Sequence, residues 1–114
     1  LITALLEYNW ISKMLADKIY HLCRQIPKGK VSTYKEIGKA LNIKAYQAIG
    51  QALRKNPYAP DVPCHRVVSS TGHLHGFKGK RKGKALKEKK LLLEQEGIHI
   101  EKNKINLKKY IHTF

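Results

Sequence analysis

The sequence predicts a mainly α-helical domain with small β hairpins, arranged as a winged helix-turn-helix. Three observations support this fold class: apolar residues recur at three- and four-residue spacing, two short helical segments follow each other closely, and β-branched pairs lie next to turn residues. A chain of 114 residues that is 42% hydrophobic is long enough for one core. We therefore expect a single domain over residues 1–114, with residues 1–9 as an N-terminal segment.

The first half of the chain predicts two helices. The first runs from Trp10 to about Gln25, where the apolar spacing indicates an amphipathic helix with Cys23 on its core side. The turn at residues 27–30 ends it. Thr33 followed by Glu36 fits a capping box, which predicts that the second helix begins there.

Two further helices and two hairpins complete the expected fold. The third helix spans residue 45 to about residue 55 and would be the DNA-facing helix of the helix-turn-helix. Residues 66–69 and 73–74 predict a small hairpin that would form the wing. A fourth helix is expected from about Ala85 to Glu96, capped by Gly97, and a last hairpin from residues 98–100 and 105–107.

The charge of the chain favours a polyanionic partner. Its 23 Lys and Arg residues against 8 Asp and Glu residues give a formal charge of +15, and each phosphate contact releases condensed counterions. The basic run at residues 78–90 is either a solvated surface or a phosphate contact. An anionic membrane surface is the alternative partner, but the sequence has no long apolar run or signal-like segment.

The cysteine content favours a reducing compartment, cytoplasmic or nuclear. Cys23 and Cys64 are the only cysteines, too few for a disulfide framework. Because the chain begins at Leu1 rather than at Met, we expect it to be a trimmed piece of a longer protein.

The motif at residues 63–68 carries the strongest chemical signal. It places His65 and Arg66 directly after Cys64, and a neighbouring base or cation is what makes a thiol nucleophilic. The alternative is that Cys64 is a small buried hydrophobic residue. A zinc site from Cys23, Cys64, His73 and His75 is disfavoured, because the spacings lack the paired ligand sets of structural zinc sites.

These residues give the chain a family resemblance. The motif at residues 63–68, together with residues 26–34, residues 56–57 and residues 91–97, resembles the alkylguanine-DNA alkyltransferases. Those proteins move an alkyl group from the exocyclic oxygen of guanine onto their own cysteine. The resemblance implies a DNA-repair protein that acts once per molecule, without a cofactor, on double-stranded DNA containing alkylated guanine. A monomer is expected.

The resemblance also implies roles for the residues of the motif. Cys64 would be the nucleophile and alkyl acceptor, His65 would relay its proton, and Glu96 would orient that histidine, as in other nucleophile, base and carboxylate triads. Main-chain groups of Cys64 and Val67 would read the edge of the base.

Three further residues receive roles in the same way. Tyr34 resembles the tyrosine that hydrogen-bonds the guanine ring and helps to protonate the leaving base, although it also fits a half-buried aromatic in the first turn of a helix. Asn56 and Arg66 resemble residues that brace the active-site turn.

The target base must rotate out of the duplex before the thiol reaches it. In the family an arginine of the third helix fills the gap, and Gln47 stands at that position here; Tyr46 is a candidate to stack into the gap. The residues expected to bind DNA are Tyr34, Ala45, Tyr46, Gln47, Gln51, Arg54, Lys78, Lys80 and Arg81.

Two alternatives to transfer remain open. The short chain and Gln47 resemble the alkyltransferase-like proteins, which bind the damaged base without transfer and recruit excision repair, but which have another residue in place of the cysteine. The other alternative is a winged-helix transcription regulator, which the basic helix-turn-helix by itself would also fit.

Overall fold

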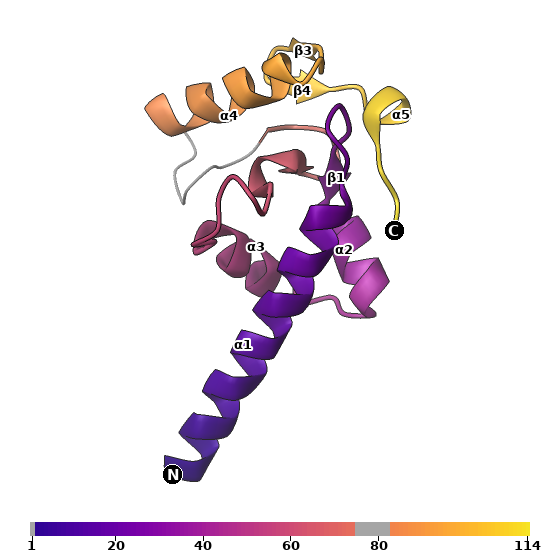
Figure 1. The fold of residues 1–114 in the computed structure, drawn as a ribbon. Coiled ribbons are helices and arrows are strands. Elements are labelled where there is room, and N and C mark those ends of the chain that lie inside the picture. The colour runs from indigo at the N-terminus through magenta and orange to yellow at the C-terminus, as the bar shows by residue number, and fades with distance from the viewer. Residues whose placement is uncertain (1, 75–82) are drawn as a thin grey trace.

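The chain is mainly helical, as expected (Figure 1). The computed structural model describes residues 2–74 and 83–114, with side chains from Lys13 onward. The elements, in chain order, are α1 (Ile2–Gln25), β1 (Ser32–Thr33), α2 (Tyr34–Leu41), α3 (Tyr46–Arg54), η1 (Cys64–Arg66), β2 (Val67–Val68), α4 (Lys84–Gln95), β3 (Ile100–Glu101), β4 (Lys104–Ile105) and α5 (Leu107–Tyr110).

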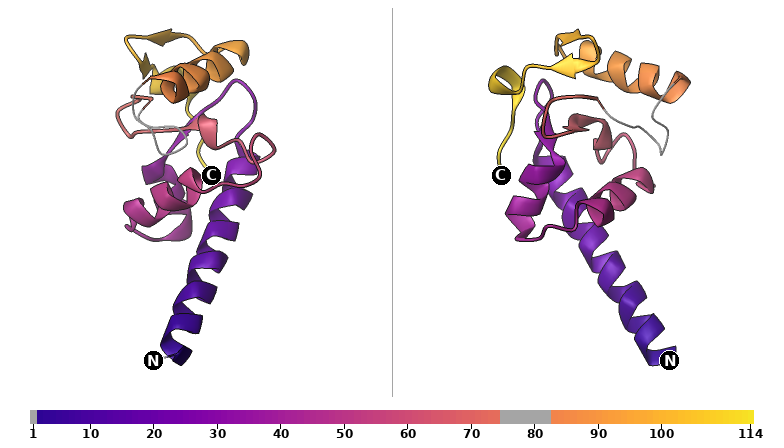
Figure 2. Two further views of the ribbon diagram at one scale, coloured as in Figure 1. Left: turned by 90° about the vertical axis from the view of Figure 1, so that its left-hand side faces the viewer. Right: turned by 180° about the vertical axis from the view of Figure 1, so that it is seen from behind.

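Helix α1 is longer than the sequence pattern predicts. It begins at Ile2 rather than near Trp10, and it ends at Gln25 as expected. Its N-terminal part projects away from the rest of the molecule in all three views (Figures 1 and 2). The C-terminal half packs its apolar side against the other helices, and Ile19, Cys23 and Ile26 are fully buried there.

Helices α2 and α3 form the expected helix-turn-helix. The Thr33 hydroxyl accepts a hydrogen bond from the Glu36 amide at 3.1 Å, so Thr33 is the N-cap of α2, as its sequence context predicts. Asn42 ends α2 in the left-handed conformation, with φ of 56°. A short connection then leads into α3, which packs against both α1 and α2.

The predicted hairpin at residues 66–74 is wrong in its pairing. The chain does turn there, since the Ser69 amide donates to the His73 carbonyl at 3.0 Å. However, β2 pairs in parallel with β1, and His73 forms its bridge with Lys104. The reason is burial: both valines of β2 are buried, which places the strand inside the domain rather than at an exposed wing.

The predicted last hairpin is confirmed. Strands β3 and β4 are antiparallel, with Ile100 opposite Ile105. Both isoleucines are buried, so this hairpin covers the core on the side of α4.

Two apolar cores meet at β2. Core 1 lies between α1, α2 and α3, and core 2 lies under α4 and the β3–β4 hairpin. Val67 belongs to core 1 and Val68 to core 2, because successive strand side chains point to opposite sides. The segment that carries the candidate nucleophile therefore leads directly into the junction of the two cores.

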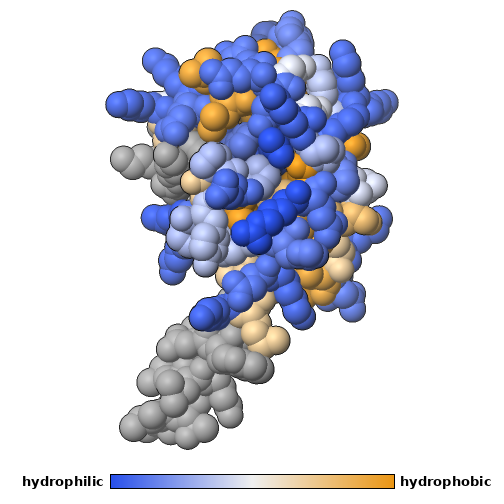
Figure 3. All heavy atoms as spheres, viewed as in Figure 1, coloured by the Kyte–Doolittle hydropathy of each residue, from blue (hydrophilic) through white to orange (hydrophobic). Residues whose placement is uncertain are grey.

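The surface is strongly polar, in keeping with the charge of the chain. Figure 3 shows hydrophilic side chains over most of one face, with small hydrophobic areas between them. None of the helices in the described part of the chain has the length and apolarity that a membrane crossing requires.

Candidate active site

Cys64 is the first residue of the short helix η1. Pro63 is the N-cap of this helix, and the Cys64 amide donates to the Val62 carbonyl at 2.8 Å, so the turn that leads into the cysteine is fixed. The thiol is not in a disulfide and is only partly buried. Cys64 packs against the edge of core 1. Its sulfur is therefore held in a defined place without being sealed inside the protein.

His65 contacts Glu96, as the resemblance implies. The His65 Nε2 and Glu96 Oε2 atoms are 3.1 Å apart, and the histidine is only 4% exposed. Burial lowers the pKa of His65, and this effect outweighs that of the hydrogen bond to Glu96, which raises it. The imidazole is therefore neutral at pH 7 and available as a base.

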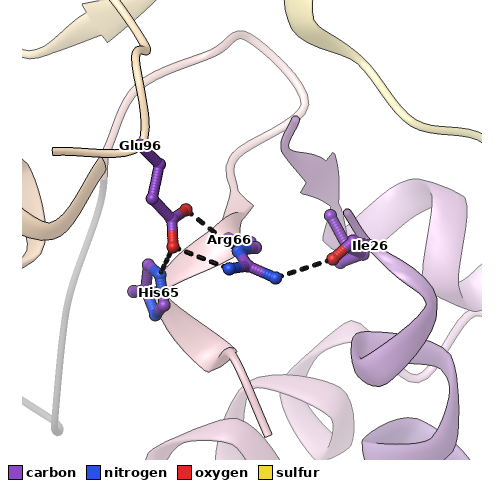
Figure 4. Close-up of polar contacts among 4 residues, drawn as sticks. All are labelled: Ile26, His65, Arg66 and Glu96. Atoms are coloured by element: carbon purple, nitrogen blue, oxygen red, sulfur yellow. Dashed lines mark hydrogen bonds and ion pairs between the residues drawn. The ribbon is translucent and has the colours of Figure 1, made fainter. Parts of the chain in front are cut away.

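Arg66 fixes Glu96 from the other side. Its Nε and Nη2 atoms donate to the two carboxylate oxygens at 2.9 and 2.7 Å, and its Nη1 atom donates to the Ile26 carbonyl at 2.8 Å (Figure 4). Burial alone would raise the pKa of Glu96, but the hydrogen bonds from Arg66 and then His65 lower it. Glu96 is therefore ionised, and Arg66 links η1 to the end of α1 and the end of α4.

The charge on Glu96 also determines the state of the histidine. A carboxylate only accepts hydrogen bonds, so His65 Nε2 carries the proton that is shared with Glu96. In a neutral imidazole the other nitrogen, Nδ1, is then an acceptor. In this arrangement of His65, Arg66 and Glu96, the Nδ1 atom of His65 is the basic nitrogen.

The end of α4 places Glu96 by its backbone. Glu96 is the C-cap of the helix, and Gly97 follows with φ of +90°, a conformation that favours glycine. The Gly97 amide donates to Glu94 and the Ile98 amide to Leu93, which is a Schellman motif. The expected cap at Gly97 is therefore confirmed, and it fixes the point from which the carboxylate reaches η1.

Asn56 spans the loop that leads to the cysteine. Its Nδ2 atom donates to the Val62 carbonyl at 2.8 Å, and its Oδ1 atom accepts from the Tyr58 amide at 2.9 Å. This matches the bracing contacts that the resemblance implies. Tyr34 is half-buried at the start of α2 and packs, like Cys64, against core 1.

The candidate DNA-binding residues of α3 lie on its exposed side. Gln47, Gln51 and Arg54 follow a spacing of four and three residues, which places them on one face, and all three are exposed. Ile49 and Leu53 point the other way into core 1. Ala45 and Tyr46, also exposed, begin the helix. Lys78, Lys80 and Arg81 lie outside the described residues.

Lys89 is a residue whose position the sequence interpretation missed. Its place in the basic run at residues 78–90 predicts a solvated surface or a phosphate contact, yet it is only 1% exposed. Its Nζ atom donates to the Val67 carbonyl at 2.8 Å and to the Leu74 carbonyl at 2.7 Å. Burial lowers the pKa of Lys89 to about 7, against a smaller opposing effect of Cys64. One signal was present: residue 89 lies four residues from both Ala85 and Leu93, the buried positions of α4.

Cys23 lies in core 1, as expected. It is fully buried, and burial raises the pKa of its thiol to about 12, so it is no nucleophile at neutral pH.

Within the described residues, no three His, Cys, Asp or Glu side chains are grouped so that they could hold a metal ion.

Known proteins share both the sequence pattern and the fold. The family model of the 6-O-methylguanine DNA methyltransferase, DNA binding domain, matches residues 14–98. A methylated-DNA-protein-cysteine methyltransferase of Sulfolobus acidocaldarius is 42% identical over 84 residues, which cover 74% of this chain and 50% of that protein. A DNA base-flipping protein of Vibrio parahaemolyticus is 41% identical over 95 residues, covering 82% of this chain and 90% of that protein.

Solved structures agree with these relatives. The S. pombe Atl1 protein, in complex with damaged DNA containing O6-carboxymethylguanine, has a TM-score of 0.76 at 32% identity, over 90% of this chain and 97% of that one. Mycobacterium tuberculosis OGT in complex with DNA has a TM-score of 0.62 at 34% identity, over 71% of this chain and 48% of that one.

The chain spans about half the length of the methyltransferases it matches, and nearly all of the base-flipping relative. Because the family model covers residues 14–98, from the second half of α1 to the end of α4, this chain belongs to the 6-O-methylguanine DNA methyltransferase family.

Proposed function

We propose that this chain repairs DNA by moving an alkyl group from the exocyclic oxygen of guanine to the sulfur of Cys64. One observation carries the proposal: a partly buried thiol directly precedes a neutral histidine whose Nε2 atom is bonded to an ionised carboxylate. This is the arrangement that activates a nucleophile through a base and an orienting acid. A structural cysteine needs none of these neighbours.

The proposed reaction begins with loss of the thiol proton. His65 Nδ1 accepts this proton, directly or through a water, and Glu96 stabilises the imidazolium that forms. The thiolate then attacks the alkyl carbon; a sulfur–carbon bond forms, the carbon–oxygen bond breaks, and its electron pair passes to the guanine. Tyr34 supplies a proton to the departing base. The thioether has no good leaving group, so each molecule acts once.

The proposed substrate is duplex DNA with an alkylated guanine rotated out of the stack. The base must leave the helix because the reacting oxygen is not accessible within it. The exposed side of α3 is proposed to lie against the DNA, with Gln47 near the gap and Arg54 at the phosphate backbone. The formal charge of +15 supports this partner and predicts binding that weakens with salt. A reducing compartment of the cell is proposed, since an oxidised Cys64 could not react.

Mass spectrometry tests the proposal directly. After incubation with a duplex containing O6-methylguanine, the peptide that contains Cys64 should gain the mass of one methyl group, with at most one transfer per molecule. The peptide that contains Cys23 is the internal control and should keep its mass, because that thiol is buried and protonated. If the lesion binds and the Cys64 peptide is unchanged, transfer is excluded.

A non-catalytic lesion binder is the second candidate. It is favoured by the match over 97% of Atl1 and 90% of the base-flipping relative, both of which are similar in extent to this chain. It predicts that Cys64→Ala binds the lesion as tightly as the wild type and that the wild type transfers nothing. A transcription regulator would instead prefer a particular undamaged sequence.

A further inference from the structure

Tyr46 is a large exposed aromatic residue at the start of α3. It is 44% exposed, whereas the buried apolar residues of the same helix, Ile49 and Leu53, are at most 8% exposed. An exposed tyrosine ring offers a flat apolar face to a binding partner. Tyr46 lies next to Gln47, another exposed residue of the same helix.

The ring of Tyr46 lies against Gly38 of α2. A Cβ atom at Gly38 would lie 2.8 Å from Tyr46 Cε1 and 2.7 Å from the Ile43 carbonyl oxygen, which is too close for any side chain. The glycine has a negative φ, so the reason for it is this close approach rather than backbone conformation. The ring is thereby set against α2 on one side while the remainder faces solvent.

The residues next to Tyr46 along the start of α3 are small or uncharged. The exposed neighbours Ala45, Gln47 and Ala48 are alanines and a neutral amide, and the first turn of α3 has no acidic residue. A DNA duplex can therefore approach the start of α3 closely without charge repulsion. Among these residues Tyr46 is the one with an apolar surface large enough to stack on a base.

We propose that Tyr46 is the residue through which α3 holds the opened duplex, by stacking on the base or sugar next to the vacated position. This inference rests on the proposed function. A ring that already packs against Gly38 loses little conformational freedom on binding. The side chain of the neighbouring Gln47 is a neutral amide, which cannot form charge-assisted bonds to DNA. Tyr46 thus determines how well this chain tells a lesion-containing duplex from an undamaged one.

Binding measurements in the Cys64→Ala background separate this inference from the transfer proposal. In that background no lesion is consumed, so affinity is measured whether or not the wild type transfers. The probes are an O6-methylguanine duplex, with a fluorescent cytosine analogue opposite the lesion, and the matched undamaged duplex. Tyr46→Ala should weaken lesion binding about tenfold or more, and Tyr46→Phe should stay within about twofold, because stacking needs the ring and not the hydroxyl.

Two comparisons decide the outcome. Gln47→Ala should lose less affinity than Tyr46→Ala, and the undamaged duplex should be affected less than the lesion duplex. Gly38→Ala, which displaces the ring, should reproduce the loss of Tyr46→Ala when its melting curve shows a folded protein; if it does not fold, the Tyr46→Ala and Tyr46→Phe pair still decides. The inference is overturned if Tyr46→Ala binds the lesion like its parent, if both duplexes weaken equally, or if Gln47→Ala carries the larger loss.

Discussion

The buried junction around Glu96 and the exposed side of α3 are held in very different ways. At the junction, Glu96 is bonded by both His65 and Arg66, and in the described part of the chain no buried side-chain nitrogen or oxygen lacks a hydrogen-bond partner. On α3, the outward side chains of Gln47 and Gln51 are exposed. The geometry of the candidate active site is therefore fixed by the fold, whereas the proposed DNA contact is free to vary at little cost in stability.

This difference has a consequence for mutation. A change at the junction disturbs several elements at once, because Arg66 joins the ends of α1 and α4 to η1. A change on the exposed side of α3 affects the partner and leaves the fold intact. Four substitutions test this contrast.

Glu96→Gln should give the largest loss of transfer. Glutamine keeps the size of the side chain but removes the charge that orients His65 and stabilises its protonated form. We expect the single-turnover rate, followed as methyl mass on Cys64 against time, to fall by about 10²–10⁴-fold. Glu94→Gln, an exposed acid one half-turn away, is the matched control and should react at the wild-type rate. Wild-type speed in Glu96→Gln would remove the carboxylate from the mechanism.

Lys89→Met should change how stability depends on pH. The pKa of Lys89 is about 7 in the folded protein against 10.5 for an unperturbed lysine. Between these values the unfolded chain binds more protons, so the free energy of unfolding rises with pH, by up to about 1.4 kcal/mol per unit. The stability difference between wild type and Lys89→Met should therefore grow in favour of the wild type by about 2 kcal/mol from pH 7 to pH 9.

Denaturant unfolding at several pH values measures this effect. Lys87→Met, on the exposed side of the same helix, is the matched control and should run parallel to the wild type across the pH range. If the wild type and Lys89→Met run parallel too, the ammonium group does not lose its proton in this range and the lowered pKa is refuted.

Asn56→Ala should have a moderate effect on stability. The substitution removes two hydrogen bonds and leaves the carbonyl of the buried residue Val62 with the Cys64 amide as its remaining donor. We expect a loss of about 1–3 kcal/mol in the free energy of unfolding. Transfer should also slow, because the loop no longer holds the Cys64 turn. Gln51→Ala, on the exposed side of α3, is the control and should unfold like the wild type. Equal stability of Asn56→Ala and wild type would show that Asn56 does not brace the turn.

Arg54→Gln should have the smallest effect. It removes one proposed phosphate contact from the exposed side of α3 without disturbing the core. Affinity should fall by a few fold on every sequence, and the slope of log affinity against log salt should decrease by about 0.9. Arg24→Gln, on α1, is the control with the same change of charge. An unchanged slope for Arg54→Gln would exclude that contact.

Much of the fold follows from short-range patterns in the sequence. The Thr33 cap, the glycine at residue 97 and the apolar spacing of α1, α3 and α4 each concern residues within four positions of one another, so one segment is enough to reveal them. The motif that begins at Cys64 is also contiguous. Because this motif is local, the sequence predicts the candidate nucleophile and the residues next to it in the chain, but not which distant residues pack around them.

Long-range contacts decided the rest. The parallel pairing of β2 with β1 joins residues more than thirty positions apart, and it prevails over the local hairpin because it buries both sides of β2. In the same way, the sequence around Lys89 predicts a surface cation. In the folded chain its Nζ atom is buried and donates to the carbonyl groups of Val67 and Leu74. Local pattern determined which segments are helical and which residue is the candidate nucleophile. Packing alone determined which polar groups are removed from water, because burial depends on what the remainder of the chain places against them.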